Sequence, residues 1–121
     1  MKRLVFTACL TMLVAGTASL SRAELKTIGT GADMGVDVSG FPPAMKELYP
    51  LFVKKCIKCH GMDRTFVTIQ TGMTPSGSVF DNSAVDAYGA KMLRKPDADM
   101  TKAEVKKFIE LMKYMLDEAA K

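Results

Sequence analysis

Two cysteines and a histidine within five residues constrain this chain more than any other part of its sequence. The run reads Cys56-Ile57-Lys58-Cys59-His60. The C-x-x-C-H spacing is the signature through which c-type haem is attached to a protein. Residues three apart lie on one face of a helix, so Cys56 and Cys59 can both bond to the vinyl groups of one porphyrin edge. His60 then offers an axial nitrogen ligand to the iron. No second C-x-x-C-H occurs in the sequence, which predicts one covalent haem c per chain.

Three other interpretations of the cysteine pair stay open at this point. A dithiol oxidoreductase uses the same C-x-x-C spacing, but in a βαβ context that this sequence lacks. A structural zinc site needs four ligands, whereas the two cysteines and the only histidine of the chain make three. A plain disulfide is the simplest interpretation for an exported protein. The histidine that follows Cys59 directly favours haem over all three.

Residues 1–23 have the pattern of a secretory signal peptide. Lys2 and Arg3 precede an uncharged apolar run, and small residues stand at positions −3 and −1 of a cleavage site after Ala23. The run is shorter than the roughly 20 apolar residues that span a bilayer, so we expect cleavage and a periplasmic protein, with an uncleaved membrane anchor as the alternative. Cleavage leaves 14 cations against 13 anions. Nucleic-acid binders carry a large basic excess, so no nucleic-acid partner is expected.

The remaining chain is long enough for one domain and a short leading segment. Residues 24–40 contain four glycines and few bulky side chains, which predicts a flexible N-terminal lead. Residues 41–121 form the predicted domain. Its first helical pattern is expected to break into two pieces at Pro50. Residues 61–82 read as a loop, with a hint of extended structure only at residues 66–69.

Another segment with helical spacing lies between this loop and Pro96. Ser83, with an acidic residue three positions on, resembles a capping box and predicts the helix start. The helix must end by Lys95, because Pro96 disfavours helical geometry in the residue before it.

The C-terminal segment is the clearest helix of the sequence. Thr101 and Glu104 form a capping box at its start. We expect this helix to pack across the first one, with Phe108 or Ile109 near the crossing. Its apolar stripe consists of Val105, Phe108, Ile109, Met112, Met115, Leu116 and Ala119.

From about residue 41 to residue 119, the chain resembles the small monohaem c-type cytochromes of class I. The likeness rests on the C-x-x-C-H run, the helix leading into it, a methionine-bearing segment and the C-terminal amphipathic helix. The resemblance implies an all-α, cytochrome c-like fold of three to four helices around one covalent haem. It also implies an electron carrier rather than an enzyme. The chain departs from better-known members in having no tryptophan and no Pro-Gly-Thr-Lys-Met or Pro-Met-Pro-Pro ligand loop.

The second axial ligand separates a carrier from an open haem site. With His60 as the only histidine, methionine is the obvious donor, since a thioether is neutral and raises the reduction potential. In the class I family this ligand precedes the last helix, which favours Met92, with Met100 and Met73 as alternatives. An iron without a methionine ligand would instead make a haem enzyme or a gas-binding module.

Coordination by His60 and Met92 leaves no vacant iron position and suits electron transfer between redox proteins. A fixed cytochrome subunit of a dehydrogenase or reductase complex is a further alternative. Basic residues flank both candidate ligands, and they form either a collar that steers acidic partners or ordinary solvated surface. These residues are Lys54, Lys55, Lys58, Lys91, Arg94 and Lys95. The candidates for hydrogen bonds to haem propionates are Tyr49, Tyr88 and Arg64.

Overall fold

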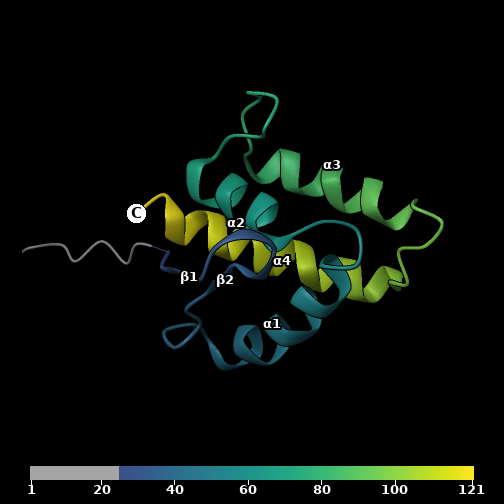
Figure 1. Ribbon diagram of the computed structural model, residues 1–121. Coiled ribbons are helices and arrows are strands. Elements are labelled where there is room, and N and C mark those ends of the chain that lie inside the picture. The colour runs from purple at the N-terminus through teal and green to yellow at the C-terminus, as the bar shows by residue number, and fades with distance from the viewer. Residues whose placement is uncertain (1–24) are drawn as a thin grey trace, which may run out of the picture.

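The computed structural model describes residues 25–121, and the expected signal peptide, residues 1–23, lies outside them. This part of the chain is mostly helical, in agreement with the all-α expectation (Figure 1). Among residues 25–121, no helix has the length and apolar composition to cross a membrane. In chain order, the elements are β1 (Thr27–Ile28), a 3-10 turn η1 (Gly31–Asp33), β2 (Gly35–Val36), α1 (Pro43–Cys56), α2 (Met62–Thr71), α3 (Asn82–Leu93) and α4 (Lys102–Ala119).

Helix α4 organises the fold, because it contacts the three other helices (Figure 1). Phe108 meets Phe52 of α1 edge to face, with ring centroids 5.5 Å apart. The predicted crossing of the first and last helices at Phe108 is therefore confirmed. Ile109 instead faces α3, where Gly89 makes room, since a Cβ on Gly89 would overlap the Ile109 side chain. The buried residues of α4 include one that the predicted stripe lacked, Leu111, beside Val105, Phe108, Met112 and Met115.

Helix α1 runs through Pro50 without a break, so the prediction of two pieces was wrong. Proline cannot donate a hydrogen bond to the carbonyl of Lys46, four residues earlier. Both Pro50 and Lys46 are exposed, so water can satisfy that carbonyl. Burial of Phe52 and Cys56 holds the second half of the helix against the core.

Helix α2 occupies residues that the sequence analysis assigned to a loop, and that prediction was wrong for residues 62–71. Met62, Phe66 and Ile69 are spaced four and three apart and are all buried. Gly72, at φ 66°, ends the helix in the left-handed conformation. Threonine, valine and isoleucine have modest helix propensity, so burial decided the structure here.

The loop after α2 is shorter than predicted and projects from the body (Figure 1). It contains an isolated bridge between Met73 and Val79. Both residues are exposed.

The N-terminal lead carries packed structure where the sequence favoured flexibility. Strands β1 and β2 pair antiparallel, and β2 and η1 lie against α2. Leu25 and Val36 belong to the same hydrophobic core as the helices. Gly29 and Gly31 adopt positive φ, which a tight connection between two strands requires. These two glycines therefore form part of the turn between β1 and β2.

The observed N-terminal cap of α4 is the predicted one, whereas that of α3 differs from the prediction. At α4 the predicted capping box is present, with the Glu104 amide donating to Thr101 Oγ1 at 3.1 Å and the Thr101 amide donating to Glu104 Oε2 at 2.7 Å. At α3 the cap is Asp81, whose Oδ1 accepts from the Ala84 amide at 2.9 Å. The predicted cap at Ser83 was therefore two residues late. The helix ends at Leu93, within the predicted limit.

We expect Asp81→Ala to lower the free energy of unfolding by about 1 kcal/mol, because it removes the side-chain acceptor at the start of α3. Ser83→Ala is the matched control and should change it by less than about 0.5 kcal/mol, as for most exposed positions. Urea unfolding of both variants measures the difference. A larger loss of stability in Ser83→Ala than in Asp81→Ala would indicate that Ser83 caps the helix, as the sequence predicted.

Candidate functional site

Two adjoining cavities open between the end of α1, α2 and α3. They share five lining residues, namely Cys56, His60, Arg64, Tyr88 and Met92. The outer cavity measures about 490 Å³ and also has Cys59, Lys55, Lys91, Lys95, Pro96, Asp97, Ala98 and Met100 in its wall. The inner cavity measures about 100 Å³ and is also lined by Phe52, Thr65, Thr68, Thr74, Pro75, Phe80 and Met112. The outer cavity falls in the size range of cofactor sites.

The end of α1 brings the cysteine pair to one wall of the cavities. The helix ends at Cys56, which is buried, and the chain continues as a turn in which the Cys59 amide donates to the Cys56 carbonyl at 3.4 Å. Cys59 is exposed, and both thiols are free. The two sulfurs thus belong to one turn of chain, although only Cys56 is part of the helix.

The ring of His60 is oriented by its neighbour. Its Nδ1 lies 3.0 Å from the carbonyl oxygen of Gly61. A carbonyl only accepts, so Nδ1 carries a proton in this arrangement, and in the neutral ring the lone pair is then on Nε2. This is the tautomer of a histidine that binds metal through Nε2 and is held through its other nitrogen.

Gly61 allows a close approach between two segments of backbone. A Cβ at Gly61 would lie 2.9 Å from the Cα of Ala32 in η1. Only glycine fits so close to another backbone, so the N-terminal segment packs directly against the residue that follows His60. The sequence analysis recorded neither this contact nor the hydrogen bond from His60.

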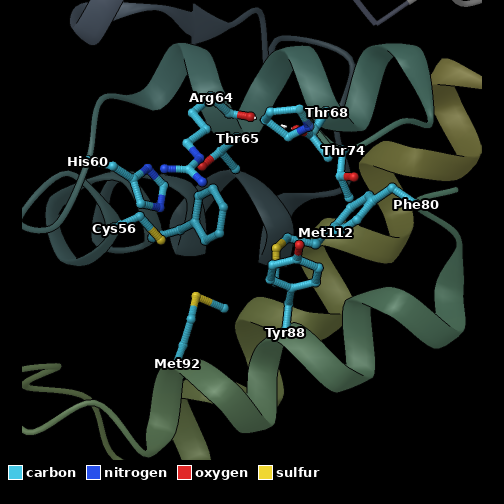
Figure 2. A pocket seen from close by; sticks show the side chains of 12 residues that line it. Cys56, His60, Arg64, Thr65, Thr68, Thr74, Phe80, Tyr88, Met92 and Met112 are labelled. Atoms are coloured by element: carbon cyan, nitrogen blue, oxygen red, sulfur yellow. Dashed lines mark hydrogen bonds between the residues drawn. The ribbon is translucent and has the colours of Figure 1, made fainter. Parts of the chain in front are cut away.

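Met92 lies on the opposite side of the cavities from Cys56 and His60 (Figure 2). It comes from the last turn of α3, is half-buried and lines both cavities. Met100 lines only the outer cavity. Met73 lies in the projecting loop, 42% exposed, and lines neither cavity. Of the three predicted methionines, Met92 alone reaches both.

The three residues proposed for hydrogen bonds to haem propionates have different positions. Arg64 and Tyr88 line both cavities, and the Tyr88 hydroxyl points into the space (Figure 2). Tyr49 lines neither cavity, and its hydroxyl accepts a hydrogen bond from the Val36 amide at 2.8 Å. Burial raises the pKa of the Tyr49 hydroxyl. Tyr49 therefore fastens strand β2 to α1, away from the site.

The environment of the Cys56 thiol differs from that of a redox-active cysteine. Burial, with a smaller contribution from the neighbouring Cys59, raises the pKa of Cys56 to about 12. The thiol therefore stays protonated at neutral pH. Cysteines of dithiol oxidoreductases attack as thiolates and have lowered pKa values, so this environment weighs against that interpretation.

The basic residues predicted to form a collar do not form one group in the structure. Lys91 and Lys95 line the outer cavity, and Lys91 Nζ lies 5.8 Å from the centre of the Tyr88 ring. Lys55 also lines the outer cavity, and both it and Lys58 contact Asp99, with Nζ to Oδ2 distances of 3.5 and 2.7 Å. These two charges lower the pKa of the Asp99 carboxyl, mainly through the hydrogen bond from Lys58. Two further basic residues of the prediction, Lys54 and Arg94, line neither cavity.

The sequence analysis missed the polar residues of the inner cavity, which come from α2 and the loop after it. Thr68 is four residues after Arg64 and three after Thr65, spacings that would have indicated one face once α2 was recognised. The Thr68 hydroxyl donates to the Arg64 carbonyl at 2.8 Å. Thr74 is buried, and its hydroxyl lies 2.9 Å from that of Ser76.

Comparison of the chain with protein-family models, with curated proteins and with solved structures found no match. The residues of the site must therefore carry its interpretation. They fit a c-type haem, because two thiols, an imidazole with a free Nε2 and a thioether face a largely apolar space.

We expect Tyr49→Phe to lower the free energy of unfolding by about 1 kcal/mol, because the Val36 amide loses its acceptor. If the cavities hold a haem, its visible spectrum should not change, since Tyr49 lies outside the site. Tyr88→Phe removes the same group inside the cavities and is the matched control. Urea unfolding followed by absorbance tests both, and a spectral change in Tyr49→Phe alone would contradict this assignment.

Proposed function

We propose that this chain is an exported electron carrier that holds one covalent haem c between His60 and Met92. The observation that carries the proposal is the position of these two side chains on facing walls of the same cavities, next to Cys56 (Figure 2). Each of the three residues lines both cavities.

Each site residue has a definite task in this proposal. The thiols of Cys56 and Cys59 would hold the porphyrin covalently. His60 would hold the iron through Nε2 while the Gly61 carbonyl keeps the ring in place. Met92 would supply a neutral thioether, which favours the reduced state. The haem, when bound, supplies an iron that accepts and releases one electron.

Apolar side chains form part of the wall of the inner cavity. Phe52, Phe80 and Met112 are buried there. Such side chains limit the access of water, and solvent access and dielectric are among the factors that set a reduction potential. If His60 and Met92 both hold the iron, a substrate would have no position on it. This is why we propose a carrier rather than an enzyme.

The partners we propose are redox proteins with acidic surfaces. Lys91, Lys95 and Arg64 lie at the cavities, where positive charge steers an acidic partner to the site. Residues 1–23, as a signal peptide, would bring the chain to the periplasm. A subunit fixed in a dehydrogenase or reductase complex would use the same surface with a permanent partner.

We expect the purified protein to have a low-spin spectrum that carbon monoxide leaves unchanged, with the weak far-red band of methionine-bound ferric haem. In Met92→Ala this band should disappear and the reduced protein should bind carbon monoxide, because the iron then has an open position. Absorption spectra of both oxidation states, with and without carbon monoxide, measure this.

Met73→Ala is the matched control, since this methionine lies outside both cavities, and it should behave as wild type. If Met100→Ala loses the band and Met92→Ala keeps it, the ligand assignment is wrong and the carrier proposal stands. A wild-type protein that is high-spin and binds carbon monoxide would overturn the carrier and favour an open haem site.

We expect Lys91→Gln combined with Lys95→Gln to slow oxidation by ferricyanide by about threefold at low ionic strength, because positive potential at the cavity raises the encounter rate of an anion. The difference should shrink at 0.5 M salt, where the Debye length is only a few ångströms. Lys106→Gln with Lys107→Gln removes the same charge from exposed positions outside both cavities. Equal rates for the two double variants, measured by stopped flow, would refute the role of the cavity lysines.

A further inference from the structure

Asp99 joins two parts of the chain that form opposite edges of the outer cavity. It lies in the α3–α4 connection, residues 94–101, which follows Met92 and leads into α4. Its Oδ2 lies 2.7 Å from Lys58 Nζ and 3.5 Å from Lys55 Nζ. The Lys55 ammonium also donates a hydrogen bond to the Asp99 carbonyl oxygen. Lys55 at the end of α1 and Lys58 in the turn after it thus hold both the side chain and the backbone of Asp99.

The backbone of Asp99 is adapted to these contacts. Among residues 25–121, it is the one non-glycine residue with positive φ, at 47°. Such a conformation is unfavourable for most side chains and persists where surrounding contacts hold it. Aspartate and asparagine tolerate it best, because their short polar side chains bond locally.

Lys55 is the less exposed of the two lysines at this junction, whereas the Asp99 side chain is 67% exposed. The Lys55 side chain is 16% exposed, compared with 44% for Lys58, so solvent screens its charge less. Its Nζ also lies 3.9 Å from Oε1 of Glu104, the residue that completes the capping box of α4. Lys55 at the end of α1 therefore contacts both Asp99 and the start of α4.

The outer cavity lies between the parts that Asp99 joins. Cys56, Cys59 and His60 line it from one side, and the α3–α4 connection lines it from the other. Met92 stands two residues before this connection. A connection that moves away from α1 would take the end of α3, and with it the Met92 thioether, away from His60.

We infer that Asp99 is a positioning residue, which clasps the α3–α4 connection to the end of α1 and so keeps Met92 facing His60. The inference rests on the proposed function, because it gives the clasp a task only if these two residues hold the haem. The contacts of Asp99 with Lys55 and Lys58 are the clasp.

Asp99→Asn tests the clasp, because asparagine keeps the backbone conformation and removes the charge. Imidazole, added to the oxidised protein, reports how readily Met92 leaves the iron. We expect the variant to bind imidazole about fivefold more tightly, the most that loss of ion pairs of this exposure gives. We expect Lys58→Gln, which removes the closer partner, to change binding in the same direction.

Asp86→Asn is the matched control. Asp86 is on α3 and pairs with Lys113 of α4 at 2.8 Å, so the variant loses the same charge and a comparable ion pair. Neither residue lines the cavities. We expect its imidazole affinity to stay within about twofold of wild type. Added salt should raise the imidazole affinity of the wild type, because it screens the ion pairs of Asp99, and should leave that of Asp99→Asn unchanged.

Hydrogen exchange tests the clasp without any haem signal. The peptide that covers residues 94–101 should exchange faster in Asp99→Asn than in Asp86→Asn, while peptides from α1 and α2 remain unchanged. Equal exchange and equal imidazole binding in the two variants would overturn the clasp, and so would faster exchange throughout the chain, which indicates a general loss of stability. A protein isolated without haem would refute the proposed function, and the exchange comparison would still decide the clasp.

Discussion

The site depends on the anchoring of α1 through Phe52. This side chain is completely buried, with its ring centroid 5.5 Å from that of Phe108 on α4 and 6.4 Å from that of Phe66 on α2. Phe52 stands one helical turn before Cys56, so three helices meet directly beneath the cysteine-bearing end of α1. Close packing of aromatic rings leaves little freedom to shift. The turn to His60 therefore starts from a fixed point. The ring of Phe52 also forms part of the wall of the inner cavity.

Sequence reasoning recovered the elements whose signals are local. The α4 cap at Thr101 and the apolar spacing after it need only neighbouring residues to form, and both were predicted. The errors occur where distant contacts decide. Helix α2 exists because Phe66 is buried against other helices, and Pro50 is accommodated because its side of α1 faces solvent. The N-terminal lead is packed because Val36 reaches the common core.

The same division applies to the candidate site. Cys56, Cys59 and His60 follow from their spacing, and Met92 was favoured by its place before the last helix, so these residues could be named from the sequence. The supporting groups could not. The carbonyl of Gly61 becomes a partner of His60 only through the path of the backbone. Asp99 meets Lys55 across 44 positions of sequence, and its positive φ has no pattern that a sequence displays.

The difference in burial between the two cysteines sets an order of events for making the protein. Cys56 is only 8% exposed in the folded chain, whereas Cys59 is open to solvent. Cys56 lines both cavities but exposes little surface, so an enzyme that joins its sulfur to a porphyrin would reach it more readily in a partly folded chain. If the chain carries haem c, we expect the bond to Cys56 to form before α1 and α3 close around it. Attachment of the haem would then precede completion of the fold.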